Sequence, residues 1–480
     1  MLAKKLFSQS AIYGLASILV NGSGFLLLPI YTRSLSPQDY GIISSIGIVS
    51  LTFTYFIGFG LSAAVNRFYF EEEYKEKWNQ FFGTVSLFLI ITGLILTVTL
   101  NFAGSWFLDH IFKSVRFDPY IKYGLWIGYA AAYSTIPLAL FQVQGKALRY
   151  RVLTTASFLA LTALMILIVV IQKQGAIGAL KAQLYAGLLM GIVYCFYMLK
   201  NGDLRINPSH LRVALVFGFP IMIYMITGVF IELSSKYFIE KLATLSDLGI
   251  YNLAQQYSSA MTLIISAVNM AWVPLFYERA KNNPTDDVFR HFGTFFITAV
   301  IMLGFILSLF SKDILSLIAS KGFQNSYTIV PIIILAYIFG NGFWILIINP
   351  LGFARKTTYL PLLTILSGCV SIILNILLIP IFGIYGAAWS LLISYVILTV
   401  SGLILAHRFF PVRYNYVKIS AVLLIAVILF FVTLLFDTFD FKYVFIIKML
   451  IVFIYAGSLL LFRIFTLEEI KSRIKNILKR

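Results

Sequence analysis

Apolar stretches of about 20 residues, separated by short turns, follow one another along the whole chain. Hydrophobic residues make up 60% of the sequence and charged residues only 12%, which is far from the composition of a soluble protein. A helix of about 20 apolar residues can cross a bilayer, and it satisfies its own backbone groups there. We count fourteen such stretches. The sequence therefore predicts an all-α polytopic membrane protein with about fourteen transmembrane helices.

The chain contains an internal repeat with an offset of 208 residues. The motif Asp-Tyr-Gly-Ile at 39–42 aligns with Asp-Leu-Gly-Ile at 247–250, and the same offset aligns Gly175 with Gly383. Each copy holds six spans, and an even number gives both copies one orientation, as in a parallel repeat about an axis along the membrane normal. We therefore expect an N-terminal six-helix lobe at 1–205, a C-terminal six-helix lobe at 206–413, helices 13 and 14 at 414–466, and a basic cytoplasmic tail at 467–480.

Basic residues gather in alternate loops of this predicted topology. The chain has 37 Lys and Arg against 19 Asp and Glu, which gives a net charge of +18. With the N-terminus in the cytoplasm, most of these cations fall in cytoplasmic segments, as the positive-inside rule requires. This explains the charge without nucleic acid as a partner, and it predicts that both termini are cytoplasmic. The sequence has no phosphate-binding loop motif, and its four histidines show no metal-ligand spacing, so we expect no cofactor and no metal.

Charged residues inside predicted spans are the first candidates for function, because charge is costly in hydrocarbon. Glu232, Lys236 and Glu240 are spaced four residues apart and share one helical face. Glu232 lies deepest, and a carboxylate paired with Lys236 could be protonated reversibly and couple transport to a H⁺ or Na⁺ gradient. The alternative interpretation is an ion pair that packs helices beside a water-filled vestibule.

Cations at the ends of spans suggest a cavity that binds an anion. Arg33 ends the first span, and the repeat offset aligns it with Lys241. Arg and Lys both bind phosphate oxygens well. We expect a central cavity lined by Arg33, Lys181, Lys236 and Lys241 in its outer half and by Arg67 and Arg290 at its inner mouth. For each residue alone, the alternative is a side chain that extends to the lipid headgroups.

Two prolines are candidate hinges. Pro29 and Pro220 fall in the first span of each lobe, and a proline within a helix removes a backbone hydrogen bond. Bending at these positions would let the lobes rock against each other. A proline near a helix end can also simply be tolerated.

Motifs spread over nearly the whole chain point to a known family. They are PIYTRSLSPQDYGI at 29–42, FGFPIMIY at 217–224, LSDLGIYNLAQQ at 245–256, and ILNILLIPIFGIYGAAWS at 373–390 with the loop ARKTTY before it. Together they resemble the polysaccharide and oligosaccharide-lipid flippases of the multidrug/oligosaccharidyl-lipid/polysaccharide exporter superfamily. The resemblance implies twelve core helices in two bundles plus two more. It also implies transport of an undecaprenyl-diphosphate-linked oligosaccharide from the cytoplasmic to the external leaflet.

The resemblance further implies a site, partners and a location. In similar flippases a cationic central cavity receives the diphosphate and the sugars, and Arg33 and Lys236 with Glu232 match that role here. The segment SSKYFIEKL carries Lys where the family more often shows Asp or Arg. The implied pathway makes O-antigen, capsule or exopolysaccharide at the bacterial cytoplasmic (inner) membrane. The implied partners are membrane lipids, a polysaccharide polymerase and other assembly proteins.

Other functions stay open at this point. An ion-coupled multidrug exporter shares the two-lobe fold but predicts acidic, aromatic-lined sites, whereas this chain has one deep acid, Glu232, and several cations. A membrane polymerase or glycosyltransferase acting on the same lipid-linked sugar predicts a large external domain or a pair of catalytic acids, whereas the loops here are short. A non-transporting scaffold of an assembly complex is the third alternative. We therefore expect a transporter that works by alternating access, not an enzyme.

Overall fold

The computed structural model describes residues 27–282, 287–412, 414–436 and 441–461. The side chains of residues 228–230, 232, 271, 274, 282, 441–443 and 459–461 are not part of this description. Most of the first predicted span, residues 10–31, and the whole predicted tail at 467–480 therefore lie outside the described residues.

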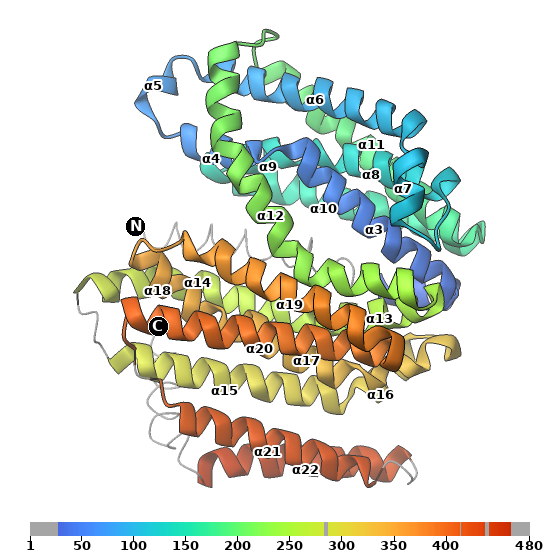
Figure 1. Cartoon of the computed structure of the whole chain (residues 1–480), viewed down its shortest axis with the longest axis vertical. Coiled ribbons are helices and arrows are strands. Elements are labelled where there is room, and N and C mark those ends of the chain that lie inside the picture. Colours follow the sequence, from blue (N-terminus) through green and yellow to red (C-terminus); the bar gives the residue numbers. More distant parts are fainter. Residues whose placement is uncertain (1–26, 283–286, 413, 437–440, 462–480) are drawn as a thin grey trace.

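The described residues form two bundles of helices stacked along the long axis of the molecule (Figure 1). The first bundle contains α2 (Leu28–Ser34), α3 (Pro37–Gly58), α4 (Leu61–Phe68), α5 (Glu72–Lys75), α6 (Trp78–Ala103), α7 (Ser105–Ile111), η1 (Phe117–Ile121), α8 (Lys122–Ala132), α9 (Thr135–Val143), α10 (Ala147–Met165), η2 (Ile166–Ile171) and α11 (Gly175–Asn201). The second bundle contains α13 (Leu245–Ser258), α14 (Ala260–Asn282), α15 (Asp287–Leu309), α16 (Ser311–Ile318), η3 (Lys321–Thr328), α17 (Val330–Tyr337), η4 (Ile338–Phe343), α18 (Ile345–Phe353), α19 (Tyr359–Phe382) and α20 (Ile384–Phe409). The helix α12 (Pro208–Leu242) links the two bundles, and α21 (Tyr416–Leu434) packs with α22 (Phe441–Leu461) beyond the second one.

The helices identify a multi-pass membrane protein. Within the described ranges, eleven helical segments are long and apolar enough to cross a membrane. A twelfth results if Leu245–Met270 and Leu275–Lys281, which are bent by 43° relative to each other, form one span. The predicted last span coincides with α22, whose described apolar core, Val444–Ser458, is shorter. The all-α membrane class is thus confirmed, whereas the structure supports eleven or twelve spans and does not establish the predicted fourteen.

The helix α12 belongs to both bundles, because its two halves pack on different helices. In its first half, the Phe217 ring lies edge-on to Phe68, with ring centroids 5.7 Å apart. A Cβ placed on Gly60 would lie only 2.2 Å from the carbonyl oxygen of Gly218, so glycine is needed for this close backbone approach. In the second half, Ser234 meets Ser371 of α19 and Lys236 meets Asn252 of α13. The predicted lobe boundary at 205/206 lies just before this shared helix (Figure 1).

Two helices of different bundles begin with the same capping box. In α3, the carboxylate of Asp39 accepts hydrogen bonds from the Ser36 backbone N–H at 3.1 Å and from its hydroxyl at 2.7 Å. In α13, Asp247 does the same for Thr244 at 3.2 and 2.7 Å. The hydroxyls in turn accept from the Asp backbone N–H groups, which satisfies donors that a helix start leaves unpaired. Both helices therefore begin with a cap formed by residues close together in the sequence, at positions that the repeat offset aligns.

Candidate functional site

The two bundles are joined where α3 and α13 begin, and we call this region the joined end, defined by Pro37, Gly41, Leu245 and Gly249. A Cβ on Gly41 would lie 1.8 Å from the carbonyl oxygen of Leu245, and a Cβ on Gly249 would lie 1.9 Å from that of Pro37. The two contacts are reciprocal, since each glycine packs on the first residue of the other helix and the repeat aligns Gly41 with Gly249 and Pro37 with Leu245. Only glycine lets two backbones approach this closely.

Helix electrostatics shape the same junction. The N-terminal ends of α3 and α13 carry partial positive charge and lie side by side, which is unfavourable without compensation. Asp39 and Asp247 place a carboxylate in the first turn of each helix. The second oxygen of Asp39 also accepts from the backbone N–H of Ala176 at 3.3 Å, which ties α11 to the start of α3. The capping carboxylates therefore offset the repulsion between the two helix ends.

Hydrogen bonds from α2 cross to the second bundle at the joined end. The Thr32 hydroxyl donates to the carbonyl of Ile318 at 3.0 Å, and the Arg33 guanidinium donates to the carbonyl of Leu317 at 3.0 Å. Both acceptors belong to the last turn of α16, whose carbonyls have no partner within the helix. Arg33, predicted to line a cavity, thus caps a helix of the opposite bundle in this conformation.

A matching connection runs from α12 back to the first bundle. Glu240 is fully buried, and one oxygen of its carboxylate accepts from the backbone N–H of Ser114 at 2.6 Å. The Ser114 hydroxyl donates to the Glu240 carbonyl at 2.8 Å, and nearby the rings of Phe112 and Tyr237 meet edge-on at 6.0 Å. The repeat offset aligns Glu240 with Thr32, so the ends of α2 and α12 make equivalent crossings in opposite directions.

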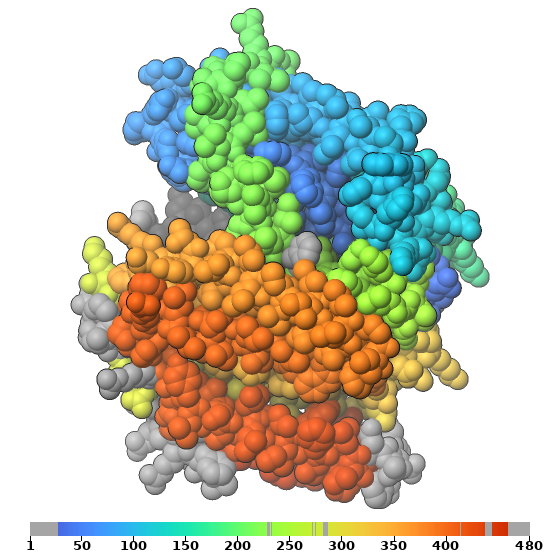
Figure 2. All heavy atoms as spheres, in the orientation of Figure 1, coloured from blue at the N-terminus to red at the C-terminus, as the bar shows by residue number. Residues whose placement is uncertain are grey.

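Away from the joined end, the described contacts between the bundles run mainly through the first half of α12. The guanidinium of Arg67 in α4 lies 4.7 Å from the ring centroid of Phe217 in that half, and it pairs with Glu71 at 3.2 Å. Figure 2 shows the first bundle in blue and the second in orange, with α12 in green running from one to the other. Among the described residues, the bundles therefore meet at the joined end and along α12.

The predicted cations do not form one cluster in this conformation. Lys236 is half-buried and donates to the side-chain oxygen of Asn252 in α13 at 2.7 Å. Lys241 donates to the hydroxyl of Tyr237 at 3.4 Å, and Lys181 donates to the side-chain oxygen of Gln174 at 3.0 Å. Together with Arg33, these side chains lie on elements that start or end near the joined end. Arg67, by contrast, contacts the first half of α12.

The remaining predicted residues are distributed differently. Arg290 is exposed in the first turn of α15. Pro29 lies in the first turn of α2, where a proline is tolerated, whereas Pro220 lies inside α12. Glu232 falls on α12, but its side chain is outside the described part of the structure. Of the two prolines predicted as hinges, Pro220 is therefore the one that interrupts the backbone bonding of a described spanning helix.

A buried polar cluster joins α12 to α19, and its α12 member, Ser234, is two residues before Lys236. The hydroxyls of Ser234 and Ser371 lie 2.9 Å apart, and the amide of Asn375 donates to both at 3.3 and 3.2 Å. Asn375 is fully buried, and its side-chain oxygen has no hydrogen-bond partner among the described atoms. A buried amide oxygen without a donor is costly. This cluster can therefore accept a proton donor or a cation.

Sequence reasoning missed the joined end, although its signal was visible. The glycines at 41 and 249 were aligned as repeat markers and were not given a role. Their shared Asp-x-Gly-Ile motif specifies both the cap and the close backbone contact. Glu240 was recognised only as a neighbour of Lys236 on one helical face, because nothing in the sequence pairs it with Ser114.

Comparisons with known proteins agree with this architecture. The model of a family described as "Polysaccharide biosynthesis protein" matches residues 6–279. An uncharacterized membrane protein of Haemophilus influenzae is 24% identical over 290 residues, and the match spans 58% of this chain and 66% of the relative, or about two thirds of its length. The lipid II flippase MurJ in an inward closed conformation has a TM-score of 0.66 at 14% identity, over 95% of this chain and 99% of that one.

The fold also matches a second type of transporter. A multidrug resistance MATE transporter of the MOP superfamily, in an inward-facing conformation, has a TM-score of 0.65 at 14% identity, over 84% of this chain and 95% of that one. At these identities the structural likenesses establish the fold alone. Because the family model covers more than half of the sequence, the chain belongs to the family described as "Polysaccharide biosynthesis protein".

Proposed function

We propose that this protein is a flippase that moves undecaprenyl-diphosphate-linked oligosaccharide units from the cytoplasmic to the external leaflet. The sugars would then enter a cell-surface polysaccharide such as O-antigen, capsule or exopolysaccharide. The proposed location is the bacterial cytoplasmic membrane, with both termini inside and the joined end facing outward. The proposed partners are membrane lipids, a polysaccharide polymerase and other assembly proteins, and the chain itself carries out no covalent chemistry.

The reciprocal contact at the joined end is the observation that carries this proposal. A transporter that works by alternating access needs an interface that seals one side and can then separate. The Gly41–Leu245 and Gly249–Pro37 contacts are made by backbone atoms, and the crossing hydrogen bonds of Arg33 and Thr32 end on backbone carbonyls. The fold of MurJ, a lipid II flippase, supports the same class of cargo.

The cations near the joined end supply the proposed diphosphate site. Arg33, Lys181, Lys236 and Lys241 each donate to a neutral oxygen in this conformation, namely a carbonyl, two amides and a phenol. A diphosphate is a stronger acceptor than these groups, because hydrogen bonds between two charged partners are shorter and stronger than neutral ones. We propose that the substrate replaces these partners. Arg33 would then leave Leu317, which couples binding to opening of the joined end.

Ion coupling is part of the same proposal. Ser234 lies on α12, the helix that carries Glu232 and Lys236. Ser371 and Asn375, whose side-chain oxygen is unpaired, lie on α19 directly against it. A H⁺ or Na⁺ entering here would change the packing of α12 on α19. Since α12 also contacts the first bundle through its other half, such a change would be passed to both bundles. Pro220 is the proposed bending point between the two halves.

Transport in proteoliposomes tests the function directly. The full chain is reconstituted with a short undecaprenyl-diphosphate oligosaccharide, and an added sugar-modifying enzyme reports its exposure on the outer face, with and without pH or Na⁺ gradients. Losing a hydrogen bond to a charged group costs about 1.5–3 kcal/mol, so Lys236→Ala and Arg33→Ala should slow exposure by roughly tenfold or more. Lys321→Ala removes an exposed cation from η3 and serves as the matched control.

The outcomes separate the alternatives. Protein-dependent exposure that is lost in both variants and kept in the control supports the flippase and its cationic site. If both variants still expose the oligosaccharide, the protein is a flippase, but the proposed cationic site is wrong. No exposure, combined with efflux of cationic dyes, would favour a drug exporter, and turnover of sugar linkages would favour a polymerase or glycosyltransferase.

A further inference from the structure

Helix α16 carries the acceptors for the hydrogen bonds that cross from α2. Those of Thr32 and Arg33 end on the carbonyls of the last two residues of α16, at 3.0 Å each. The helix η3, which follows α16, continues the same surface, because the ring of Phe323 lies edge-on to that of Tyr40 in α3, with centroids 5.9 Å apart. We call residues 311–328, which comprise α16 and η3, the platform. The start of the first bundle therefore docks on the platform at the joined end.

The platform begins with a helix that is too short to hold its own position. Helix α16 has eight residues, which is about two turns. Isolated helices shorter than about 12–15 residues are only marginally stable, and most of their stability in proteins comes from packing against other elements. The position of the acceptor carbonyls therefore depends on what packs against α16.

A buried ion pair connects α16 to α22. The ammonium of Lys448 in α22 lies 2.6 Å from a carboxylate oxygen of Asp313 in the first turn of α16. Lys448 is 4% exposed and Asp313 is 9% exposed, so salt screens their attraction little. Close by, the rings of Phe310 and Phe445 lie with their centroids 5.8 Å apart. These contacts hold α22 against the start of α16.

The internal repeat associates this acid with α22. The offset of 208 residues aligns α16 with α7 of the first bundle, and it aligns Asp313 with Ser105. No residue of α7 is buried, whereas Ser311, Asp313 and Leu315 of α16 are. The first copy thus has a short helix without a carboxylate at this position, and the second copy has an acid where α22 packs on the helix.

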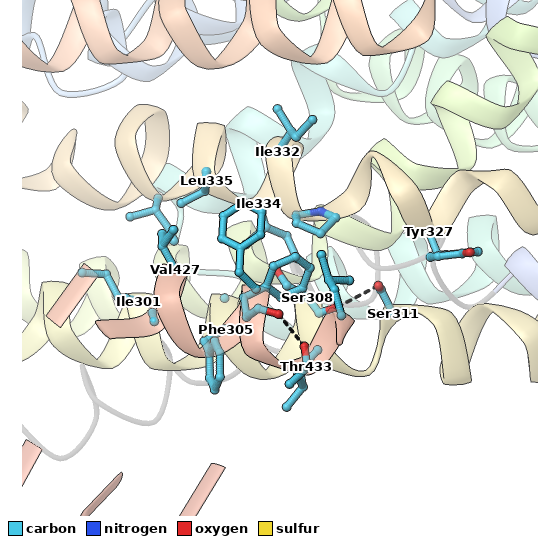
Figure 3. A pocket seen from close by; sticks show the side chains of 18 of the residues that line it. Ile301, Phe305, Ser308, Ser311, Tyr327, Ile332, Ile334, Leu335, Val427 and Thr433 are labelled. Carbon is cyan, nitrogen blue, oxygen red and sulfur yellow. Dashed lines mark hydrogen bonds between the residues drawn. The ribbon is translucent and has the colours of Figure 1, made fainter. Parts of the chain in front are cut away.

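The packing of α21 on the second bundle is incomplete. A cavity of about 560 Å³ lies between them, and Lys448 also lines it. Figure 3 shows Ile301 and Phe305 of α15 and Val427 of α21 at this cavity. Side chains that line a cavity lack protein neighbours on one side and contribute less dispersion energy to the attachment. Because the hydrophobic effect does not drive helices together within a bilayer, the ion pair contributes a larger share of this attachment.

We propose that Lys448 is a positioning residue that, through Asp313, holds the platform where α2 docks on it. The helices α21 and α22 act as a brace that favours the closed joined end. Lys448 acts through α16, whose first turn carries Asp313 and whose last turn carries the acceptor carbonyls. That the joined end opens during transport rests on the proposed function, whereas the positioning of the platform does not.

The distance between α3 and α16 tests the brace. Gln38 in the first turn of α3 and Leu317 in the last turn of α16 are exposed. Both are replaced by spin-labelled cysteines after Cys195 and Cys369 are changed to serine. The backbone carbonyl at position 317, which accepts from Arg33, is retained. The full chain is placed in lipid nanodiscs, and electron paramagnetic resonance records the distance distribution well below the thermal midpoint of each protein.

Three variants separate positioning from stability. Lys448→Met removes the ion pair, and it destabilises the protein because the Asp313 carboxylate stays buried without its partner. Combining Lys448→Met with Asp313→Asn leaves no buried charge at the pair, so most of the stability should return while the ion pair stays absent. Tyr455→Phe is the control, because it removes a hydrogen bond to the Val422 carbonyl between α21 and α22 and leaves α16 unchanged.

The expected result is a shift that does not follow stability. The wild type and Tyr455→Phe should give the same short distance. Lys448→Met and the double variant should both add a longer-distance population. If the platform moves far enough to lose the bond from Arg33, the ratio of displaced to docked molecules should rise roughly tenfold or more, since that bond involves a charged donor.

Two results would overturn the proposal. A double variant with recovered stability and the distance distribution of the wild type would show that the pair only stabilises the fold. An equal shift in Tyr455→Phe would show that the effect does not pass through Asp313. Transport is measured separately in proteoliposomes. A wild type that fails to transport would count against the proposed function and leave the distance result as it stands.

Discussion

A methyl group at position 41 should force the joined end apart. In Gly41→Ala the new Cβ would lie 1.8 Å from the Leu245 carbonyl oxygen, and ordinary contact begins only at 3.4 Å. The obstacle is backbone, so no rotamer change can relieve it and the two helices must separate. Overpacking of this kind costs about 1–3 kcal/mol. Only the joined conformation bears this cost, because the contact is absent once the bundles part.

The expected effect is a shift of population. A differential cost of about 1–3 kcal/mol changes the ratio of separated to joined molecules by roughly 5- to 150-fold. Gly249→Ala should have a similar effect, since its Cβ would lie 1.9 Å from the Pro37 carbonyl. Gly47→Ala is the matched control, because this glycine lies in the same helix and a Cβ there meets nothing within 4 Å.

Spin labels across the junction measure the shift. Gln38 and Ser246 lie in the first turns of α3 and α13, at positions that the repeat offset aligns, and are replaced by labelled cysteines after Cys195 and Cys369 are changed to serine. Electron paramagnetic resonance should find a longer-distance population in Gly41→Ala and not in Gly47→Ala. Identical distance distributions in the two variants, with both proteins folded, would refute the reasoning.

Three further predictions use side chains near this end. Glu240→Gln keeps the shape of the side chain but weakens its charge-assisted hydrogen bond to Ser114 by about 1 kcal/mol, so the same labels should report roughly fivefold more separated molecules. An unchanged population would show that this hydrogen bond does not hold the joined end together. Lys448→Met leaves the buried Asp313 carboxylate without its partner at a cost of about 3–5 kcal/mol, which should lower the thermal midpoint, and adding Asp313→Asn should restore most of it. A double variant no more stable than the single one would argue against that pair. Ser36→Ala removes a helix cap worth about 1 kcal/mol and should destabilise the protein more than Ser50→Ala within α3, and equal effects would dismiss the cap.

Local signals in the sequence predicted the parts of the fold that depend on local chemistry. Apolar stretches long enough to cross a bilayer predicted the membrane helices. The Asp-x-Gly-Ile motifs at 39–42 and 247–250 aligned the two copies, and the capping box that ends at each Asp is encoded in four consecutive residues. The family followed from motifs of the same kind.

Contacts between distant residues could not be predicted in this way. Glu240 meets Ser114 across 126 residues, and Lys448 meets Asp313 across 135. A single sequence contains no signal for such pairs, since each depends on how whole helices pack. Arg33 was expected to face a cavity, and its bond to Leu317 depends on the conformation of the interface. The predicted cationic site therefore stays a prediction, and the joined end is what the structure adds to it.

Crosslinking the joined end tests the account most directly. Gln38→Cys and Ser246→Cys, in the background lacking Cys195 and Cys369, are bridged by a short reducible bifunctional thiol reagent in the proteoliposome assay. If transport requires α3 and α13 to separate, exposure of the lipid-linked oligosaccharide should stop on crosslinking and return on reduction. The single-cysteine variants should transport throughout. Undiminished transport by fully crosslinked protein would contradict the account.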